Sequence, residues 1–454
     1  MTIGKPLMLV AFFFPVVTLS ENDSWKTVRM AAGNVALAYR LSVPMNSHPD
    51  RAFPRGFMWG VATSAFQDDG GCGKTDWDGL VTMQRVKPVF VGFTNDDVLL
   101  AKQYGVNYVR TSIEWARIEP SRGVWDEEEL ERAFQKFQFM VRNDVGVIVN
   151  LNHFTLPSWV ADGGSWENDE LPALFAEYVG KVAQKFKPLG IAYWMTFNEI
   201  MPLVAEAYVN GHYAPYEKGN FEGAMIARRN IIHAHHLAYR VLHETLDTPK
   251  GKVKVGVAHL VDSYMPADPA NIKDRQATSA LEFAMNFSLI DSIADSLDYI
   301  GLNYYSGWRI KFNAFSIFFG APVQYVNTKR KEDSFYPEGI YRIVKQFARY
   351  HKPIIITESG IDDGADKKRP AFIVSHLYWI QKAASEAPAD APVLGFFYWT
   401  LLDNFEWLAN GPAHYGLFRV DPNTKERSPR PSAFLFRDIT QANGLTEDML
   451  ARAR

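Results

Sequence analysis

Short apolar segments and longer helical segments alternate along most of this chain. The eight apolar segments have the length of single strands: Phe57–Ala65, Val106–Ile113, Val145–Leu151, Ala192–Glu199, Val253–His259, Leu297–Tyr305, Pro353–Glu358 and Val393–Trp399. The stretches between them, such as Glu127–Val141 and Leu171–Phe186, have the apolar spacing typical of helices. Strands alternating with helices predict a parallel sheet, and eight repeats predict an α/β fold of one closed (β/α)8 barrel, a TIM barrel.

The composition fits a globular enzyme and argues against several other classes. The chain has 454 residues, of which 47% are hydrophobic, and a net charge of −3, so no basic excess indicates nucleic-acid binding. Cys72 is the only cysteine, which excludes an intrachain disulfide. The 12 tryptophans suit sugar stacking, although a large aromatic core explains them equally well. No metal-ligand spacing or nucleotide-binding glycine loop stands out, so we expect no metal and no cofactor.

The first 50 residues form an extension whose role the sequence does not define, and the barrel domain is expected over residues 51–454. Residues 6–19 are an apolar run that is too short to span a membrane comfortably and is interrupted by Pro15. This run fits a signal-peptide core without a convincing cleavage site, a peripheral membrane contact, or a segment packed on the body. We expect a cytoplasmic location, with membrane association or export as alternatives.

Two of the strand segments end in a glutamate. Ile354-Ile355-Ile356-Thr357 leads into Glu358, and Tyr193–Asn198 leads into Glu199. A carboxylate at the end of a buried strand is costly unless it is paired, hydrogen-bonded or used in chemistry. One such glutamate is explained equally well by a structural ion pair. Two of them, at the ends of two strands, suit an enzyme that needs an acid and a nucleophile facing one bond.

Other polar and aromatic residues also fall at or near the carboxyl ends of strands, the face that carries the active site of such a barrel. They are Gln67, Arg110, His153, Asn198, Asn303, Tyr305 and Trp399. Each has a structural alternative: Arg110 as a barrel ion pair, His153 as a core histidine, and Trp399 as a core aromatic residue.

Seven segments together carry a resemblance to a known family: FPRGFMWGVATSAFQ (53–67), YVRTSIEWARIEP (108–120), NHFTLPSWV (152–160), TFNE (196–199), IGLNYYS (300–306), ITESG (356–360) and YWTLLDNFEW (398–407). From about Phe53 to its C-terminus, the chain resembles glycoside hydrolase family 1, the retaining β-glycosidases. The fold that this resemblance implies is the same eightfold barrel.

The resemblance also implies roles for individual residues. Glu199 matches the general acid/base and Glu358 matches the nucleophile. Arg110, Tyr305 and Asn303 match residues that support the nucleophile. The implied sugar contacts are Gln67, His153, Asn198, Glu406 and Trp407, with Trp399 as the stacking platform. Such a pair of carboxyl groups is expected to lie roughly 5–5.5 Å apart.

The chain departs from the family pattern at several positions. Ile200 replaces the usual Pro, Phe154 replaces a common Trp, and Asp68-Asp69 and Asn410-Gly411 occupy positions where other residues are usual. These changes leave the catalytic residues in place, but the preferred sugar and leaving group no longer follow from the family pattern. Glu406 argues against a 6-phosphosugar substrate, because its carboxylate would repel the phosphate.

We therefore expect a retaining exo-β-glycosidase acting on β-glucosides, with β-galactosides or β-fucosides as further substrates. Four segments (255–266, 335–344, 356–363 and 368–377) also resemble the plant galactolipid galactosyltransferases of the sensitive-to-freezing subgroup. The alternative function is accordingly that of a membrane-associated transglycosylase that acts on glycolipids. In that case the apolar segment 312–320 is expected to be a loop that receives the lipid, although a loop packed on the protein's own core explains it equally well. A third hypothesis is a barrel that binds a sugar or a lipid without catalysis. The presence of both glutamates argues against it, because a non-catalytic protein needs neither of them.

Overall fold

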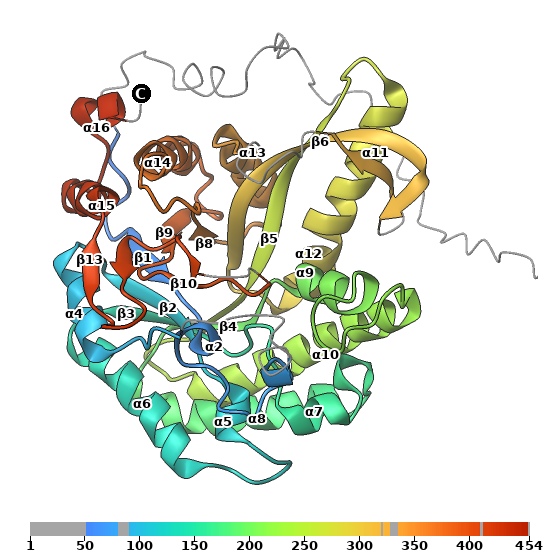
Figure 1. Ribbon diagram of the computed structural model, residues 1–454, viewed down its shortest axis with the longest axis vertical. Helices are drawn as coiled ribbons and strands as arrows, with labels where there is room; N and C mark the ends of the chain where they lie inside the picture. The colour runs from blue at the N-terminus through green and yellow to red at the C-terminus, as the bar shows by residue number, and fades with distance from the viewer. Residues whose placement is uncertain (1–50, 80–89, 319–320, 327–334, 409–411, 453–454) are drawn as a thin grey trace, which may run out of the picture.

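The computed structural model describes residues 51–79, 90–318, 321–326, 335–408 and 412–452. Residues 1–50, including the apolar run 6–19, and Asn410-Gly411 lie outside this description. Within it, eight parallel strands follow each other around a closed barrel, because β5 pairs with both β4 and β6 (Figure 1). These strands are β1 Met58–Ala62, β2 Tyr108–Ser112, β3 Gly146–Asn150, β4 Tyr193–Asn198, β5 Lys254–Pro266, β6 Ile300–Phe318, β8 Ile354–Ser359 and β9 Val393–Trp399. The (β/α)8 barrel predicted from the sequence is confirmed.

Most helices lie between successive strands in the chain, and α15 and α16 follow the last strand. They are α2 Ala65–Asp69, α4 Asn95–Gln103, α5 Trp115–Ile118, α6 Glu127–Arg142, α7 Ser158–Asp162, α8 Leu171–Phe186, α9 Ile200–Val204, α10 Phe221–Leu246, α11 Ile272–Glu282, α12 Ser288–Ile293, α13 Glu338–Phe347, α14 Arg369–Ser385, α15 Pro431–Ala442 and α16 Glu447–Arg452. A local signal fixes the start of α6, where the Asp126 side chain accepts a hydrogen bond from the Glu129 amide. None of the helices in the described ranges is long and apolar enough to cross a membrane.

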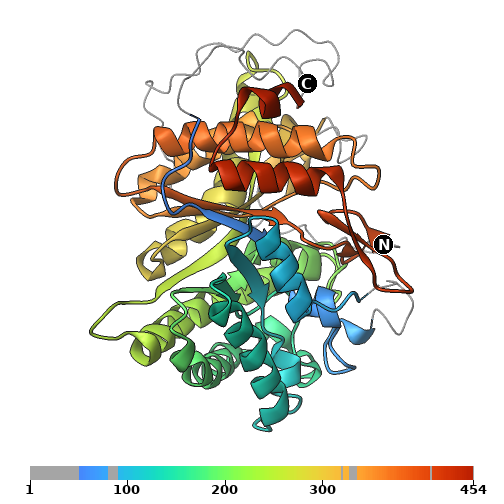
Figure 2. The same cartoon turned by 90° about the vertical axis from the view of Figure 1, so that its left-hand side faces the viewer.

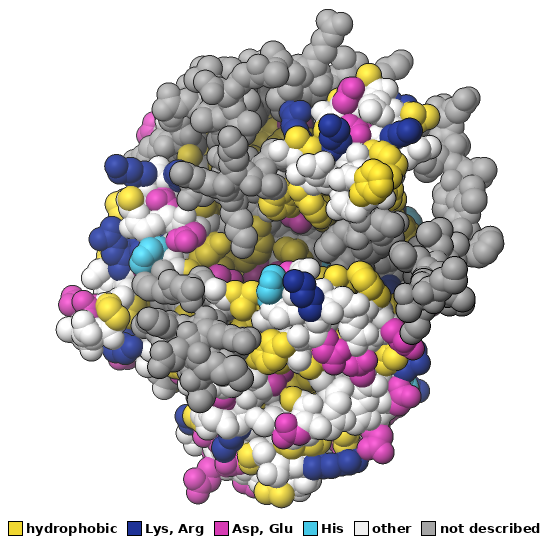
Figure 3. Space-filling model, turned by 45° about the vertical axis from the view of Figure 1, so that its right-hand side comes forward, with side chains coloured by type: hydrophobic (Ala, Val, Ile, Leu, Met, Phe, Trp, Pro, Cys, Tyr) yellow, Lys and Arg dark blue, Asp and Glu magenta, His cyan; other side chains and the backbone are white. Residues whose placement is uncertain are grey.

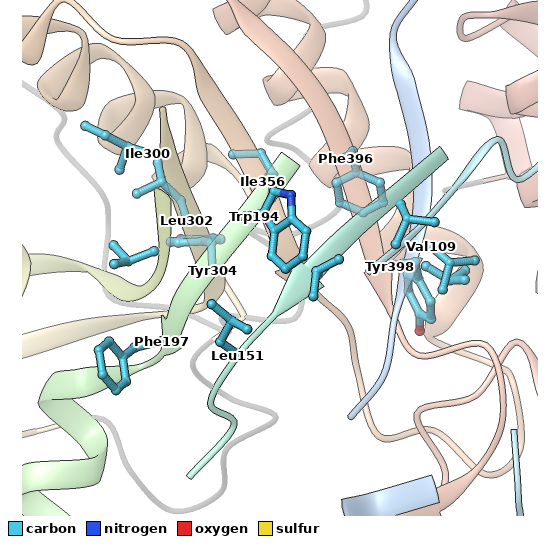
Figure 4. Packing of buried hydrophobic residues seen from close by; sticks show 14 of the residues in the cluster. Val109, Leu151, Trp194, Phe197, Ile300, Leu302, Tyr304, Ile356, Phe396 and Tyr398 are labelled. Carbon is cyan, nitrogen blue, oxygen red and sulfur yellow. The ribbon is translucent and has the colours of Figure 1, made fainter. Parts of the chain in front are cut away.

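The alternation of side chains along each strand separates two apolar layers. In β8, Ile354 and Ile356 belong to the large outer core beneath the helices, whereas Ile355 belongs to a small inner cluster with Met195 and Phe397 from β4 and β9. Figure 4 shows part of the outer layer, with Val109, Leu151, Trp194, Ile300, Leu302, Ile356, Phe396 and Tyr398 contributed by different strands or their ends. Inward-facing positions near the strand ends are therefore available for polar side chains.

Strands β5 and β6 continue well beyond the barrel as a two-stranded ribbon (Figure 1). Strand β7 (Ala321–Tyr325) pairs antiparallel with the end of β6, and α11 packs against this ribbon through Leu281, Tyr264 and Ile310. The expectation of a loop over residues 312–320 was wrong, because the described part of this segment to Phe318 is strand. The apolar residues of the ribbon form a small core of their own with α11.

The two ends of the described barrel are joined. Ala52 forms a β-bridge with Gly444, and Arg51 pairs with Glu447 at 2.9 Å. Helices α14 and α15, orange and red in Figure 2, lie side by side above the strands. The remaining strands form two small hairpins in the segment after β9: β10 Asn404–Phe405 with β11 Pro412–Ala413, and β12 Phe418–Val420 with β13 Arg427–Pro429.

Candidate active site

Glu199 and Glu358 lie at the carboxyl ends of β4 and β8. Glu358 is the fifth residue of β8 and its side chain is buried. Glu199 follows the last residue of β4 and has a left-handed backbone, with φ of 47°, immediately before α9. A left-handed backbone conformation at a glutamate costs free energy of order 1 kcal/mol or more. It persists where the surrounding structure stabilises it, as is common at functional sites.

Glu358 is held between a cation and a phenol. Arg110, from β2, donates a charge-assisted hydrogen bond to Oε1 of Glu358. The Tyr305 hydroxyl lies 2.7 Å from Oε2 and donates to it. Burial and the nearby Glu358 charge raise the pKa of Tyr305 well above its usual value, so the phenol keeps its proton. Both oxygens of Glu358 therefore accept a hydrogen bond, one from a cation and one from a phenol.

Arg110 lies inside the barrel with no solvent exposure, and its side chain contacts residues of both β4 and β8. Its Nη2 donates to the Asn198 side-chain oxygen at 2.6 Å, and its Nε lies 3.3 Å from the Met195 sulfur. Three directions of the guanidinium are thus fixed by Glu358, Asn198 and Met195. The role of Met195 was missed in the sequence, where it reads as an ordinary apolar residue of a buried strand.

Asn303 contacts the other glutamate. Its amide nitrogen donates to Oε1 of Glu199 at 2.7 Å and to the Asn198 oxygen at 3.1 Å, while Thr357 donates to the Asn303 oxygen at 2.7 Å. The resemblance had placed Asn303 with Glu358, so its partner is corrected. The pairing of β6 with β8 shifts register between Leu302 and Asn303, and such an irregularity redirects a side chain.

The two carboxyl groups have opposite environments. Burial, the charge of Glu358 and that of Glu406 raise the pKa of Glu199 to about 8, although Asn303 and Arg110 oppose this shift. Glu199 therefore holds a proton at neutral pH while Glu358 contacts a guanidinium. Such a pair can supply a proton and a nucleophile to the same bond.

A histidine and two tryptophans form a stack beside this pair. The His153 ring is nearly parallel to Trp407 (5.7 Å, 16°) and more tilted against Trp399 (5.9 Å, 27°). The Asn198 amide lies 3.2 Å from Nε2 of His153. Burial and the Arg110 charge lower the pKa of His153 well below its usual value, so the ring is neutral. All three rings are buried, which agrees equally with sugar contacts and with the core roles considered above.

Gln67 and Glu406 are the remaining residues for which sugar contacts are expected. The Gln67 amide donates to the Phe405 carbonyl at 2.9 Å and to Glu406 Oε2 at 3.4 Å, and the Ser64 hydroxyl donates to the Gln67 oxygen at 2.7 Å. The face turned forward in Figure 3 is hollowed, with hydrophobic and acidic side chains in the hollow. In the described residues, no group of three or more His, Cys, Asp or Glu side chains is arranged to hold a metal ion.

The structure therefore brings the expected residues together through direct contacts. A continuous chain runs from Tyr305 through Glu358, Arg110 and Asn198 to Asn303 and Glu199, and a branch leads from Asn198 to His153 and the two tryptophans. Gln67 reaches Glu406, the neighbour of Trp407 in the chain.

Known proteins with similar sequences and structures cover most of this chain. The β-galactosidase of Pyrococcus woesei is 29% identical, over 87% of this chain and 98% of its own length. A 6-phospho-β-galactosidase of Staphylococcus epidermidis is 27% identical, over 86% of this chain and 99% of its own. Among solved structures, the β-glycosidase from Pyrococcus horikoshii superposes with a TM-score of 0.80 at 28% identity, covering 88% of this chain and 98% of that one.

The family 1 β-glucosidase from Thermotoga maritima superposes with a TM-score of 0.77 at 26% identity, covering 88% of this chain and all of that one (100%). The profile of glycosyl hydrolase family 1 matches residues 49–294 and 288–445, which is nearly the whole barrel. The barrel, the paired glutamates at its strand ends and this match lead to one conclusion: the chain belongs to glycosyl hydrolase family 1 and is a β-glycosidase.

Proposed function

We propose that this β-glycosidase is a retaining exo-enzyme that hydrolyses β-glucosides, with Glu358 as nucleophile and Glu199 as general acid and base. β-Galactosides and β-fucosides are further candidate substrates. One observation carries the proposal: the two carboxyl groups occupy opposite electrostatic environments in one network. Glu199 has a pKa raised to about 8, whereas Glu358 accepts hydrogen bonds from Arg110 and Tyr305.

In the first step, a carboxylate oxygen of Glu358 attacks the anomeric carbon. The bond from that carbon to the glycosidic oxygen breaks, its electron pair stays on the oxygen, and Glu199 transfers its proton there. The leaving group departs as an alcohol and a glycosyl ester with Glu358 remains. Tyr305 and Arg110 then lose the charge that they stabilised, while Glu199 becomes ionised.

In the second step, Glu199 accepts a proton from water as the water oxygen attacks the anomeric carbon. The ester bond breaks and its electron pair returns to Glu358, which regains its contacts with Arg110 and Tyr305. Two inversions give net retention of the β-configuration. Asn303 supports this cycle because its hydrogen bond favours the ionised form of Glu199.

The neighbouring polar side chains are proposed sugar contacts. Asn198 is held by Arg110 and Asn303, which suits a residue that binds the 2-hydroxyl. Gln67, His153, Glu406 and Trp407 are proposed for the remaining hydroxyls, and Trp399 for the apolar face of the ring. The Glu406 carboxylate favours a sugar without a phosphate, which distinguishes the proposed substrate from that named for the staphylococcal relative.

The experiment is a panel of aryl β-D-glucoside, galactoside, fucoside and 6-phosphogalactoside substrates, with NMR detection of the first-formed anomer. We expect release of the β-anomer from unphosphorylated substrates, with the glucoside preferred. The α-anomer as first product, or activity confined to the phosphorylated sugar, would contradict the proposal. Exclusive transfer to an added galactolipid, with no hydrolysis, would favour the membrane-associated transglycosylase instead. The cytoplasmic location and the domain limits also stay predictions.

A further inference from the structure

Resting on the proposed function, we infer that Asn150 is a positioning residue for the sugar site. Its side-chain oxygen accepts the Nδ1 proton of His153 and holds that ring in the tautomer whose Nε2 is an acceptor. Asn150 is the last residue of β3, and Asn198 is the last residue of the neighbouring strand β4. The His153 ring contacts both side chains. Asn150 lies outside the motifs that carry the family resemblance.

Both ring nitrogens of His153 face an amide nitrogen. The Asn150 side-chain nitrogen lies 3.4 Å from Nδ1, and the Asn198 side-chain nitrogen lies 3.2 Å from Nε2. A neutral imidazole has one N–H donor and one acceptor nitrogen, and an imidazolium has two donors. Neither form can accept from two amide N–H groups, so one of the two asparagines must present its oxygen to the ring.

Asn198 is not the amide that turns. Its side-chain oxygen accepts from Nη2 of Arg110 at 2.6 Å and from the Asn303 amide at 3.1 Å. A guanidinium has donors and no acceptor, so exchanging the oxygen and nitrogen of Asn198 would set N–H groups against N–H groups. Arg110 therefore fixes the direction of the Asn198 amide, whose nitrogen must donate to Nε2 of His153.

The orientation of the His153 ring is fixed as well. Trp407 and Trp399 stack on the ring and hold its plane, and both are almost fully buried. A half-turn of the ring within this plane would put carbon atoms where the two nitrogens lie and would lose both amide contacts. The ring therefore keeps Nε2 toward Asn198 and Nδ1 toward Asn150.

Asn150 is the residue that can present its oxygen. Apart from the contact with His153, its side chain makes no hydrogen bond with any described residue, and its oxygen is buried without a partner. Exchanging the two atoms therefore breaks no other contact. With the oxygen toward Nδ1, hydrogen bonds are donated in one direction, from Arg110 to Asn198, from Asn198 to His153 and from His153 to Asn150.

The proposed sugar contact of Asn198 depends on this direction. Asn198 uses one N–H for His153, and its second N–H, which has no partner among the described residues, is the donor available for the 2-hydroxyl. Burial and the Arg110 charge lower the pKa of His153 well below its usual value, so Nε2 stays an acceptor. Without Asn150 the buried Nδ1–H would have no acceptor, which is costly, and the ring and the Asn198 amide would be held less firmly.

The first measurement identifies the tautomer. The chain is labelled with ¹⁵N in its 11 histidines, and a long-range ¹H–¹⁵N correlation distinguishes a protonated ring nitrogen from an unprotonated one. A His153→Gln variant assigns the signals of His153. We expect the proton on Nδ1 in the unaltered chain. A proton on Nε2, or on both nitrogens, would overturn the inference.

The variant Asn150→Asp tests the direction of the hydrogen bond. The two side chains have the same shape, but a carboxylate can only accept. At about pH 9, well above the ordinary pKa of a histidine, this variant should carry the proton on Nδ1, as the unaltered chain does. If the Asn150 nitrogen were the donor to Nδ1, the unaltered chain would carry the proton on Nε2 and the aspartate would move it to Nδ1. Such a difference between the two proteins would contradict the assignment.

The variant Asn150→Leu tests the positioning role. It removes the acceptor, so KM for an aryl β-glucoside should rise about three- to tenfold, the range of one hydrogen bond. The alkaline limb near pH 8 should stay in place, because the groups that shift the pKa of Glu199 are unchanged. The matched control is Asn230→Leu, which removes another buried asparagine, one in α10 whose nitrogen donates to the Trp166 carbonyl at 3.0 Å. KM should not change in that control, since a loss of folded protein lowers the maximal rate and not KM.

An unchanged KM in Asn150→Leu, or an equal rise in Asn230→Leu, would remove the positioning role from Asn150. The tautomer of the unaltered chain is measured without any variant, so it decides the direction of the hydrogen bonds even if Asn150→Leu does not fold. If the unaltered chain released no sugar from aryl β-glucosides, the proposed function would fail, whereas the NMR measurement would still identify the tautomer of His153.

Discussion

The side-chain amide nitrogen of Asn303, in β6, lies 2.7 Å from Oε1 of Glu199 and joins β6 to the carboxyl end of β4. The same nitrogen reaches Asn198, whose oxygen also accepts from Arg110. Arg110 in turn binds Glu358, so the two glutamates are linked through three polar side chains. This network joins Glu199, whose pKa is raised to about 8, to Glu358, which contacts a guanidinium.

Replacing Asn303 by Ala should shift the alkaline limb of the pH–activity profile upward. The Asn303 hydrogen bond lowers the pKa of Glu199, which burial and Glu358 raise to about 8, so its loss leaves Glu199 protonated to higher pH. The measurement is kcat/KM for an aryl β-glucoside from pH 5 to pH 10. Thr357→Val, which removes the donor to the Asn303 oxygen, should shift the limb in the same direction but less. A downward shift of the limb in Asn303→Ala would contradict this assignment.

Replacing Glu358 by Gly should reduce turnover of aryl β-glucosides by about a thousandfold or more, because no nucleophile remains. Added azide should restore turnover and give an α-glycosyl azide, since a small anion can enter the vacated space. The product is identified by NMR. Full activity without azide, or a β-glycosyl azide, would remove Glu358 from the nucleophile role.

Replacing Glu199 by Ala should affect substrates according to their leaving groups. An alkyl β-glucoside needs the proton and should lose activity by about a hundredfold or more, whereas a dinitrophenyl β-glucoside should lose far less in its first step. The alkaline limb near pH 8 should also disappear, because its titrating group is gone. Steady-state and burst kinetics on the two substrates provide the measurement, and equal losses on both would exclude the acid role.

The buried Glu114 should make the fold less stable as the pH rises. Burial raises its pKa from 4.5 to about 7, and the Thr155 hydroxyl donates to its oxygens at 3.0 and 2.8 Å. Because its folded-state pKa is raised, protonated Glu114 adds to the free energy of unfolding below about pH 4.5. This contribution, at most roughly 3 kcal/mol, is lost as the pH rises through about 7. The free energy of unfolding of Glu114→Gln should therefore fall less between pH 5 and pH 8 than that of the unaltered chain. An unchanged pH dependence in chemical denaturation would contradict the shift.

Much of the barrel could be predicted because its strands are buried on both faces. Three consecutive isoleucines at 354–356 have no exposed side, and the structure divides them between the outer core and the barrel interior. The helix predicted at Leu171–Phe186 has the same limits in the structure. The ribbon formed by the continuation of β5 and β6 was not predicted, because barrel strands are short and residues 312–318 were interpreted as part of a loop. That extension is stabilised by pairing with β5 and packing on α11, which are contacts between residues distant in the chain, and by a local hairpin with β7.

The identities of the site residues could be predicted better than their partners. Arg110, Asn198 and Tyr305 lie on inward-facing strand positions, so their proximity follows from the barrel. The partner of Asn303 depends on a register shift between β6 and β8, which no local pattern encodes.

Trapping the covalent intermediate tests the central claim most directly. The chain is incubated with a 2-deoxy-2-fluoro-β-glucoside that carries a dinitrophenyl leaving group, then digested and sequenced by mass spectrometry. We predict one fluoroglucosyl group per chain, attached to Glu358 and absent from the Glu358→Gly variant. A label on another residue, or complete turnover with no labelled intermediate on any time scale, would contradict the double displacement at Glu358.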